Sequence, residues 1–171
     1  MWSPRGGALL CTLLLASLGL SACQIRPLYA TAAGEPGPQV DLPAIAVDPP
    51  VNREEQVYRN ALLLALRGGA EGAPPRYSLV YRLTIREQEI LVERDTGTPN
   101  AYQLTGNVSF LVKDMATGQS LYGSNVTAVD SYTRSSQNYA NIRARRDAED
   151  RLGEVLAELT QARLAAFFAT N

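Results

Sequence analysis

The sequence contains no histidine, two cysteines and a single lysine among its 171 residues. Histidine is the commonest general base and the commonest metal ligand in proteins, so its absence argues against most catalytic and metal sites. The one lysine, Lys113, has no serine motif around it that would form a nucleophile–base pair. The sequence also has neither a glycine-rich phosphate loop nor metal-ligand spacing. We therefore predict a protein that is not an enzyme and that has no metal.

The N-terminus has the pattern of a bacterial lipoprotein signal. Residues 1–5 carry one positive charge, residues 6–20 carry none, and Leu20-Ser21-Ala22-Cys23 ends the segment with an apolar residue, two small residues and a cysteine. A transmembrane helix needs about 20 apolar residues, and an ordinary secretory signal does not require the cysteine. We predict that residues 1–22 are removed as a signal peptide and that Cys23 carries a covalent lipid, which anchors the chain to a membrane.

The mature chain, residues 23–171, is long enough for about one domain. Its 15 basic and 17 acidic residues give a net charge of −2, which gives no reason to expect a nucleic-acid partner. No free thiol remains for a disulfide, so a hydrophobic core must stabilise the fold. Six of the ten prolines lie between residues 24 and 50. We interpret residues 23–39 as a lipidated extended tether and residues 40–171 as a single domain.

Local patterns predict the elements at the start of this domain. Residues 40–47 are apolar enough for a strand, which Pro43 would confine to a sheet edge or a bulge. Asn52, with Glu55 three residues later, predicts the start of a helix, and Gly68-Gly69 predicts its end. The apolar stripe expected to bury this helix consists of Val57, Ala61, Leu64 and Ala65, thickened by Leu62, Leu63 and Leu66.

Three strands and a long helix are predicted next. Runs at 77–86, 102–113 and 120–132 are strand-like; the first two alternate apolar and polar residues, and the third is less regular. Turn residues separate the runs, which predicts an antiparallel meander. A helix is expected from Asn138 to Phe168, with Gly153 as a weak point that costs about 1 kcal/mol relative to alanine. Its expected buried stripe consists of Ala148, Leu152, Val155, Leu159, Ala162 and Ala166.

These elements predict an α+β fold in the order βαβββα. Each strand run has one apolar face and each helix has one apolar stripe. Both are buried most simply in a two-layer sandwich with the two helices on one face of the sheet. The strand–helix–strand start favours a right-handed crossover between parallel strands, so the four-stranded sheet is expected to be mixed.

Arginines are the main candidates for a binding function. Arginine makes bidentate, charged hydrogen bonds to phosphate, although an arginine beside acidic residues is more often ordinary surface. The polar segment Ser135–Asn141 is either the capped entry of the last helix or a contact surface. The arginines near the ends of the meander and the start of the last helix are Arg86, Arg94, Arg134, Arg143, Arg145 and Arg146.

Two segments resemble a known family. The mature start Cys23-Gln24-Ile25-Arg26-Pro27-Leu28-Tyr29 is similar to that of the LPS-assembly lipoprotein LptE family, in its alphaproteobacterial branch. The entry of the last helix resembles the same branch at Ser131-Tyr132 through Ser135, Tyr139-Ala140, Ala144 and Asp147-Ala148. This sequence has Gln24-Ile25 where the branch usually has Gly-Phe, and it lacks a long polar C-terminal tail.

The resemblance implies an outer-membrane lipoprotein that plugs and helps to assemble an LptD-like β-barrel and that assists lipopolysaccharide insertion. It also implies that basic residues bind lipopolysaccharide. Arg94 best matches the family's basic loop residue, and Arg143 is the preferred second member, with Arg145 left open. Gln24, rather than Asp, after the cysteine agrees with the outer membrane. The alternatives are a different outer-membrane transport accessory and, from another class, a lipoprotein hydrolase.

Overall fold

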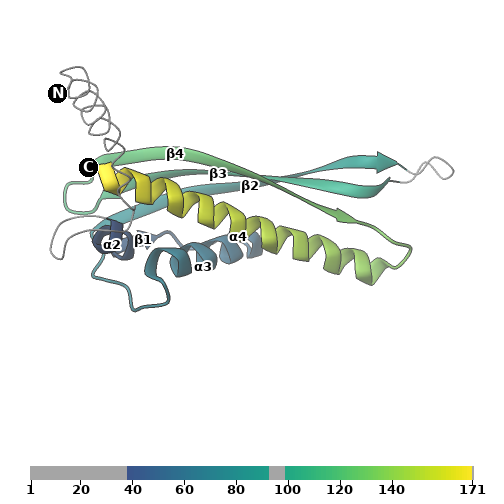
Figure 1. Cartoon of the computed structure of the whole chain (residues 1–171), viewed down its shortest axis with the longest axis horizontal. Coiled ribbons are helices and arrows are strands. Elements are labelled where there is room, and N and C mark those ends of the chain that lie inside the picture. Colours follow the sequence, from purple (N-terminus) through teal and green to yellow (C-terminus); the bar gives the residue numbers. More distant parts are fainter. Residues whose placement is uncertain (1–37, 93–98, 171) are drawn as a thin grey trace, which may run out of the picture. The chain divides into compact units, whose positions relative to one another are not determined.

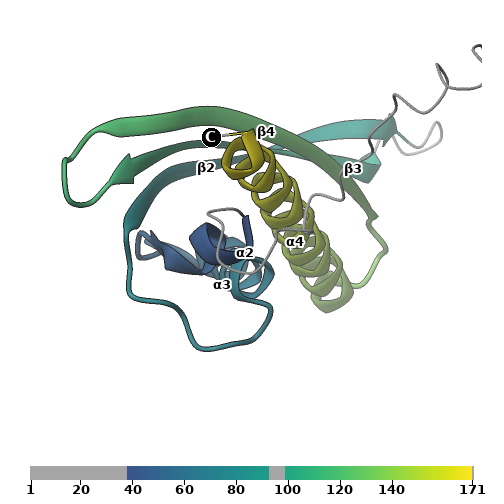
Figure 2. The ribbon, with the colours of Figure 1, turned by 60° about the vertical axis from the view of Figure 1, so that its left-hand side comes forward.

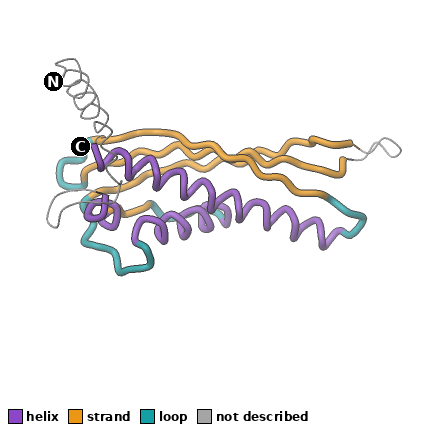
Figure 3. The backbone as a smooth tube through the Cα atoms, viewed as in Figure 1, coloured by secondary structure: helices purple, strands orange, loops and turns teal. Residues whose placement is uncertain are grey.

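The computed structural model describes residues 38–92 and 99–170. The chain divides into two compact units, residues 1–30 and 31–171, and all described residues belong to the second. Within that unit, which we call the domain, a four-stranded sheet forms one layer and the long helices α3 and α4 form the other (Figures 1 and 3). Both helices lie on the same face of the curved sheet, as Figure 2 shows. The predicted α+β sandwich is therefore confirmed.

The sheet is mixed, and its strand order follows the sequence, β1-β2-β3-β4. Strand β1 (Ile45–Val47) is parallel to β2 (Tyr77–Val92), and α3 (Arg53–Arg67) forms the crossover between them. Strands β3 (Pro99–Asp114) and β4 (Ser120–Thr133) complete an antiparallel meander with β2. Strands β2 and β3 are longer than the runs predicted, because their pairing with each other continues beyond the regular alternation.

The strand expected over residues 40–47 is wrong in its first half. A short helix, α2 (Pro38–Asp41), and a 3-10 turn, η2 (Leu42–Ala44), precede β1, which is only three residues long. Pro43 has no N–H to donate and has a fixed φ, both of which favour the turn. The buried carboxylate of Asp41 accepts hydrogen bonds from the Tyr77 hydroxyl and from Arg76, each at 3.1 Å, and so fastens this turn to the start of β2.

The turn between β3 and β4 follows the sequence signal closely. The Asp114 side chain accepts hydrogen bonds from the backbone N–H groups of Ala116 and Thr117 at 2.8 and 2.9 Å. These bonds lower the pKa of Asp114 below its ordinary value. Gly118 has a φ of 72°, a left-handed conformation that glycine adopts without strain, and its N–H donates to the Asp114 carbonyl.

Helix α3 begins and ends where predicted, but only part of its predicted stripe is buried. The Asn52 side chain accepts the Glu55 N–H at 2.8 Å, and Gly68 ends the helix with a φ of 60°. The buried residues are Tyr58, Leu62 and Leu66, whereas Leu64 from the predicted stripe is 64% exposed. Leu62 and Leu66 were therefore predicted correctly. Most of the α3 side of an open groove of about 600 Å³ between α3 and α4 comes from the rest of the predicted stripe, and Glu154 and Glu158 lie on its α4 side; the stripe residues that line it are Val57, Ala61, Leu64 and Ala65.

Helix α4 (Asn138–Thr170) has the expected extent, but its buried stripe winds around the helix. Buried positions recur at every fourth residue, at Ala148, Leu152, Leu156, Thr160, Leu164 and Phe168. A spacing of four exceeds the helical repeat of 3.6, so the buried line rotates along the helix as it passes under the twisted sheet. Val155 and Leu159, which were predicted to be buried, are 45% and 40% exposed.

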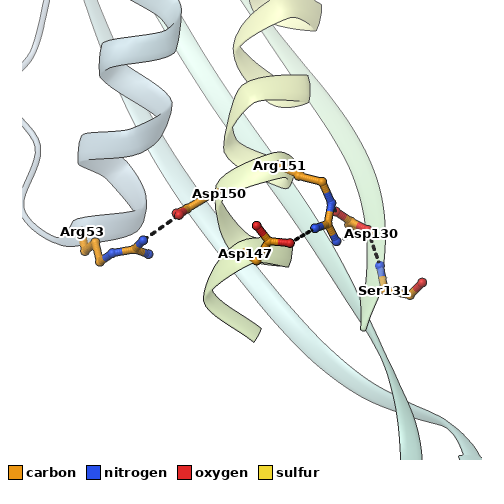
Figure 4. Close-up of polar contacts among 6 residues, drawn as sticks. All are labelled: Arg53, Asp130, Ser131, Asp147, Asp150 and Arg151. Atoms are coloured by element: carbon orange, nitrogen blue, oxygen red, sulfur yellow. Dashed lines mark hydrogen bonds and ion pairs between the residues drawn. The ribbon is translucent and has the colours of Figure 1, made fainter. Parts of the chain in front are cut away.

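Ion pairs hold the first half of α4 on two sides, as Figure 4 shows. Asp150 accepts from Arg53 of α3 at 2.7 Å. Arg151 points the other way and pairs with Asp130 of β4 at 2.9 Å, and it also pairs with Asp147. These pairs are partly exposed, so each contributes little energy, but together they indicate which side of α4 faces each neighbour.

Gly153 allows the two helices to approach closely, which corrects its interpretation as a weak point. A Cβ atom at this position would lie 3.2 Å from Val57 Cγ1 and 3.4 Å from the Tyr58 backbone nitrogen. Nearby, the buried Tyr58 hydroxyl donates to Thr160 Oγ1 at 3.1 Å, and burial raises the pKa of this tyrosine. The intrinsic helix penalty of the glycine is offset by close helix packing.

Gly106 in the centre of β3 is expected to be intolerant of a larger residue. A Cβ atom there would lie 2.7 Å from Leu156 Cδ1 and 3.0 Å from Leu152 Cδ2 of α4. We expect Gly106→Val to overpack this contact and to lower the free energy of unfolding by about 1–3 kcal/mol, which thermal or urea unfolding would measure.

Gly123→Val is the matched control, because Gly123 lies in β4 on the opposite face of the sheet and is exposed. Its Cβ atom would meet only the end of the Leu111 side chain, at 3.3 Å, and a backbone oxygen at 3.7 Å. We expect no loss of stability from this variant. An equal loss from both variants would contradict the close approach of α4 to β3.

Candidate functional site

The face of the sheet that turns away from the helices is uncovered by any other described element (Figure 2). We call it the open sheet face. Strand register places alternate residues of β2, β3 and β4 side by side across this face. Residues that are register partners across β2, β3 and β4 form rows on this face. The central rows are Arg82, Ser109 and Asn125; Thr84, Asn107 and Thr127; Arg86, Thr105 and Val129; and Gln88, Gln103 and Ser131.

The open sheet face is basic and rich in hydroxyl and amide groups. Among its described residues are the bases Arg82, Arg86 and Lys113 and no carboxylate. The carboxylates of the three long strands, Glu87, Glu89, Asp114 and Asp130, fall at the alternate positions, on the side of the helices. The sheet therefore separates charge by face, although the chain as a whole is nearly neutral.

A shallow hollow of about 290 Å³ lies in the middle of the open sheet face. Its lining residues are Thr84, Arg86, Thr105, Asn107 and Thr127. The Asn107 side chain donates to Thr127 Oγ1 at 2.8 Å, which orients both groups across β3 and β4. One guanidinium beside three hydroxyls and an amide could bind a sugar hydroxyl together with a phosphate or carboxylate oxygen.

The second basic region is at the start of α4, and we call it the arginine end: Arg134, Arg143, Arg145 and Arg146. Arg145 forms ion pairs within the domain, because its Nε lies 3.1 Å from a carboxylate oxygen of Glu87 and 3.0 Å from one of Glu149. Arg134 lies over the Tyr102 ring and donates to its hydroxyl at 3.1 Å. Arg143 and Arg146 are exposed and have no ion pair among the described residues.

Hydrogen bonds join the segment before α4 to the first turn of the helix. The Asn141 side chain accepts the Ser135 N–H at 2.7 Å and donates to the Ser135 carbonyl at 2.9 Å. Asn141 is buried, although it lies in the first turn of α4. These bonds fix the path of the chain from β4 into α4, and Tyr139 remains 76% exposed beside them. These bonds are not the N-cap that the sequence predicts, because Asn141 lies inside the helix. The segment is a helix entry, and its use as a contact surface stays a prediction.

No group of three or more potential metal ligands occurs in residues 38–92 and 99–170. In the same ranges, no helix is both long enough and apolar enough to cross a membrane.

Comparison with known proteins identifies the family. The family model for LptE, described as lipopolysaccharide-assembly, matches residues 42–164, which is more than half of the chain. The chain belongs to the LptE family. LptE-family proteins are non-enzymatic accessory proteins of lipopolysaccharide transport. The family agrees with the resemblance of residues 23–29 noted in the sequence.

Solved structures share the LptE-like fold. A candidate lipoprotein from Caulobacter crescentus has 24% identity and a TM-score of 0.64, with 78% of this chain and 97% of that chain covered. A minor lipoprotein from Acinetobacter baumannii has 17% identity and a TM-score of 0.53, with 71% and 91% covered. No curated protein matches the sequence significantly.

The residues that the sequence singled out for this LptE-family chain lie in different places. Cys23 and Arg94 are outside the described residues, as are the predicted signal peptide and most of the predicted tether. Arg143 is exposed on the first turns of α4. It lies about half a helical turn from Arg145, which faces Glu87 on the sheet, so its side chain is directed away from the sheet.

Sequence reasoning missed the open sheet face as a basic site. The signal was present in the alternation of β2, where Arg82 and Arg86 share one parity and Glu87 and Glu89 share the other. The expectation that arginines beside acidic residues are ordinary surface did not separate these two sets of charges. The alternation assigns them to opposite faces, and Figure 2 shows that the helices cover only one of these faces.

Proposed function

We propose that this LptE-family chain is an outer-membrane lipoprotein, anchored by lipid on Cys23, that occupies the lumen of an LptD-like barrel and assists lipopolysaccharide insertion at the cell surface. The chain would help the barrel to assemble and would act through binding, without chemistry of its own. The observation that carries the proposal is the open sheet face, which is a broad basic surface rich in hydroxyl groups and left uncovered by both helices.

Such a surface suits the ligand and the partner. Lipopolysaccharide presents phosphates and sugar hydroxyls together, and the hollow around Arg86 offers a guanidinium among hydroxyl and amide groups. A barrel lumen is lined by polar side chains, which a polar sheet face can contact without burying unpaired apolar area. The Caulobacter and Acinetobacter proteins with this fold are both described as lipoproteins, which supports a membrane-anchored protein of this type.

Affinity purification of the lipidated protein from detergent-solubilised outer membrane tests the partner. We expect one large β-barrel to copurify in about equal amount and to retain its association at raised salt, because a plug is enclosed by its barrel. Recovery of the chain with a different envelope complex would support the transport-accessory alternative. Turnover that one Ser or Glu substitution abolishes would support the hydrolase alternative.

Two charge-reversal double variants test lipopolysaccharide binding. Arg82→Glu with Arg86→Glu reverses the open sheet face, and Arg94→Asp with Arg143→Asp reverses the pair that the family resemblance implies. We expect each double variant to weaken lipopolysaccharide binding about tenfold or more at matched salt, because each loses charged hydrogen bonds to phosphate and adds repulsion. Binding to immobilised lipopolysaccharide would be measured with the purified protein.

Arg163→Asp is the control for both double variants, because Arg163 is an exposed arginine in the second half of α4, remote from the arginine end. It should bind lipopolysaccharide like the wild type. If only the Arg82 variant loses binding, the ligand site is the open sheet face alone. Unchanged binding in both double variants would reduce these arginines to ordinary surface and would remove the main support for the proposed function.

A further inference from the structure

The groove between α3 and α4 is an apolar surface that no other described element covers. It measures about 600 Å³ and is lined by residues of the two helices, with none from the sheet. Its α3 side consists of Val57, Asn60, Ala61, Leu64 and Ala65. Leu64 is 64% exposed. A partner surface laid in the groove would remove this apolar area from water, which is favourable.

The shape of the groove suits a rod-like occupant. Val57, Ala61 and Leu64 are spaced as i, i+4 and i+7, so they form one stripe along α3. The two helices meet at Gly153, where a Cβ atom would lie 3.2 Å from Val57 Cγ1. The stripe from Val57 to Ala65 is about 12 Å long, and its two small alanines would let a third helix approach closely.

The α4 side of the groove is acidic and its charge is not neutralised by the described residues. Glu154 and Glu158 line this side, are exposed and have no ion pair within residues 38–92 and 99–170. Arg151, three residues before Glu154, is held by Asp130 and Asp147 instead. Like charges four residues apart destabilise a helix slightly, so α4 gains no stability of its own from this arrangement.

Charge and spacing select the occupant. Two carboxylates beside the groove repel the phosphates of an anionic lipid, whereas they attract lysine and arginine side chains. Glu154 and Glu158 are separated by about 6 Å along the axis of α4. Basic residues at i and i+4 of a helix lying alongside have the same separation, so both carboxylates could be paired at once. The apolar stripe of such a helix would cover Leu64 and its neighbours on α3.

We propose that the groove between α3 and α4 docks a short basic amphipathic helix of a partner protein. The apolar stripe of that helix lies on Val57, Ala61 and Leu64, and its lysines or arginines pair with Glu154 and Glu158. The contact spans only two to three helical turns, so it is at the small end of specific interfaces and is reversible. This surface is separate from the open sheet face, and the proposal does not depend on the barrel or lipopolysaccharide functions.

Photo-crosslinking of the mature, lipidated protein in nonionic detergent tests the docking with a model peptide. The probe is an acetylated, amidated helix of about 15 residues, with leucine at i, i+4 and i+7, lysine beside that stripe, alanine elsewhere and one benzophenone. We expect mass spectrometry to place the cross-links on residues 57–65 and 154–158. Glu158→Lys should raise the peptide concentration for half-maximal cross-linking about tenfold or more. The matched control is Glu89→Lys, an exposed glutamate of β2 outside the groove, which should have no effect.

Leu64→Ala tests the apolar part of the groove, with Val51→Ala as its control, because Val51 is 86% exposed and lies outside the groove. We expect several-fold weaker cross-linking for Leu64→Ala alone, and thermal unfolding of each variant ensures that only folded protein is compared. A second peptide with glutamate in place of every lysine should not label the groove. Equal labelling by both peptides would indicate general hydrophobic association and would overturn the proposal. Cross-links of the lysine peptide mainly outside the groove would also overturn it.

Discussion

Leu152→Asp is expected to unfold the domain. Leu152 is 1% exposed, lies under β3 beside Gly106, and belongs to the core that α4 shares with the sheet. An unpaired carboxylate there would lose its water and would have no partner to neutralise it. Such a burial costs several kcal/mol, which is comparable with the whole free energy of unfolding of a domain, about 5–15 kcal/mol. Circular dichroism at 25 °C should show loss of the cooperative thermal transition.

Leu159→Asp is the matched control one heptad further along the same helix. Leu159 was expected from the sequence to be equally buried, but it is 40% exposed, so its aspartate could remain hydrated. We expect its melting temperature to stay within a few degrees of the wild type. If Leu159→Asp unfolds the domain as Leu152→Asp does, the straight stripe predicted from the sequence, which contains both leucines, would be correct and the winding stripe of α4 would be wrong.

Cys23→Ala is expected to abolish membrane anchoring. The proposed lipid on Cys23 comprises a diacylglycerol and an N-acyl chain, which together exceed the two signals needed for stable anchoring. Without the cysteine, no lipid can be attached, and the precursor would remain uncut or be miscut. We expect an all-or-none change, measured by mass spectrometry of the mature N-terminus and by fractionation of the envelope.

Cys11→Ala is the matched control, because it removes the other cysteine from the segment predicted to leave with the signal. It should leave lipidation, cleavage and fractionation unchanged. An unmodified Cys23 in the wild type would refute the anchor itself. A lipidated wild type that fractionates with the inner membrane would refute only the outer-membrane assignment, which depends on Gln24.

Much of the fold follows from signals that act between near neighbours. Helix α3 begins after the Asn52 cap and ends at Gly68, both at the predicted residues, because capping bonds form within one turn. The period-two alternation predicts which residues of β3 are buried, from Tyr102 to Val112, because a pleated strand has only two faces. The parallel crossover through α3 follows from the handedness rule, since few topologies satisfy it.

The binding residues were less predictable. The charge of each strand residue was evident, but its role depends on which face the helices cover. Arg145 and Arg143 are two residues apart and similar in sequence context, yet Arg145 pairs with Glu87 across the domain and Arg143 is exposed. Glu87 is distant in sequence, so no local pattern separates the two arginines.

The sequence by itself determined where most of the elements begin and end, the order βαβββα, and the apolar side of each central strand. Only the tertiary structure decided which faces of α3 and α4 are buried and which side of the domain stays open. A helix has a continuous range of faces, and α4 is apolar over more than one of them. Its crossing over a twisted sheet buries Leu156 and exposes Leu159, because contacts between residues far apart in sequence set that angle.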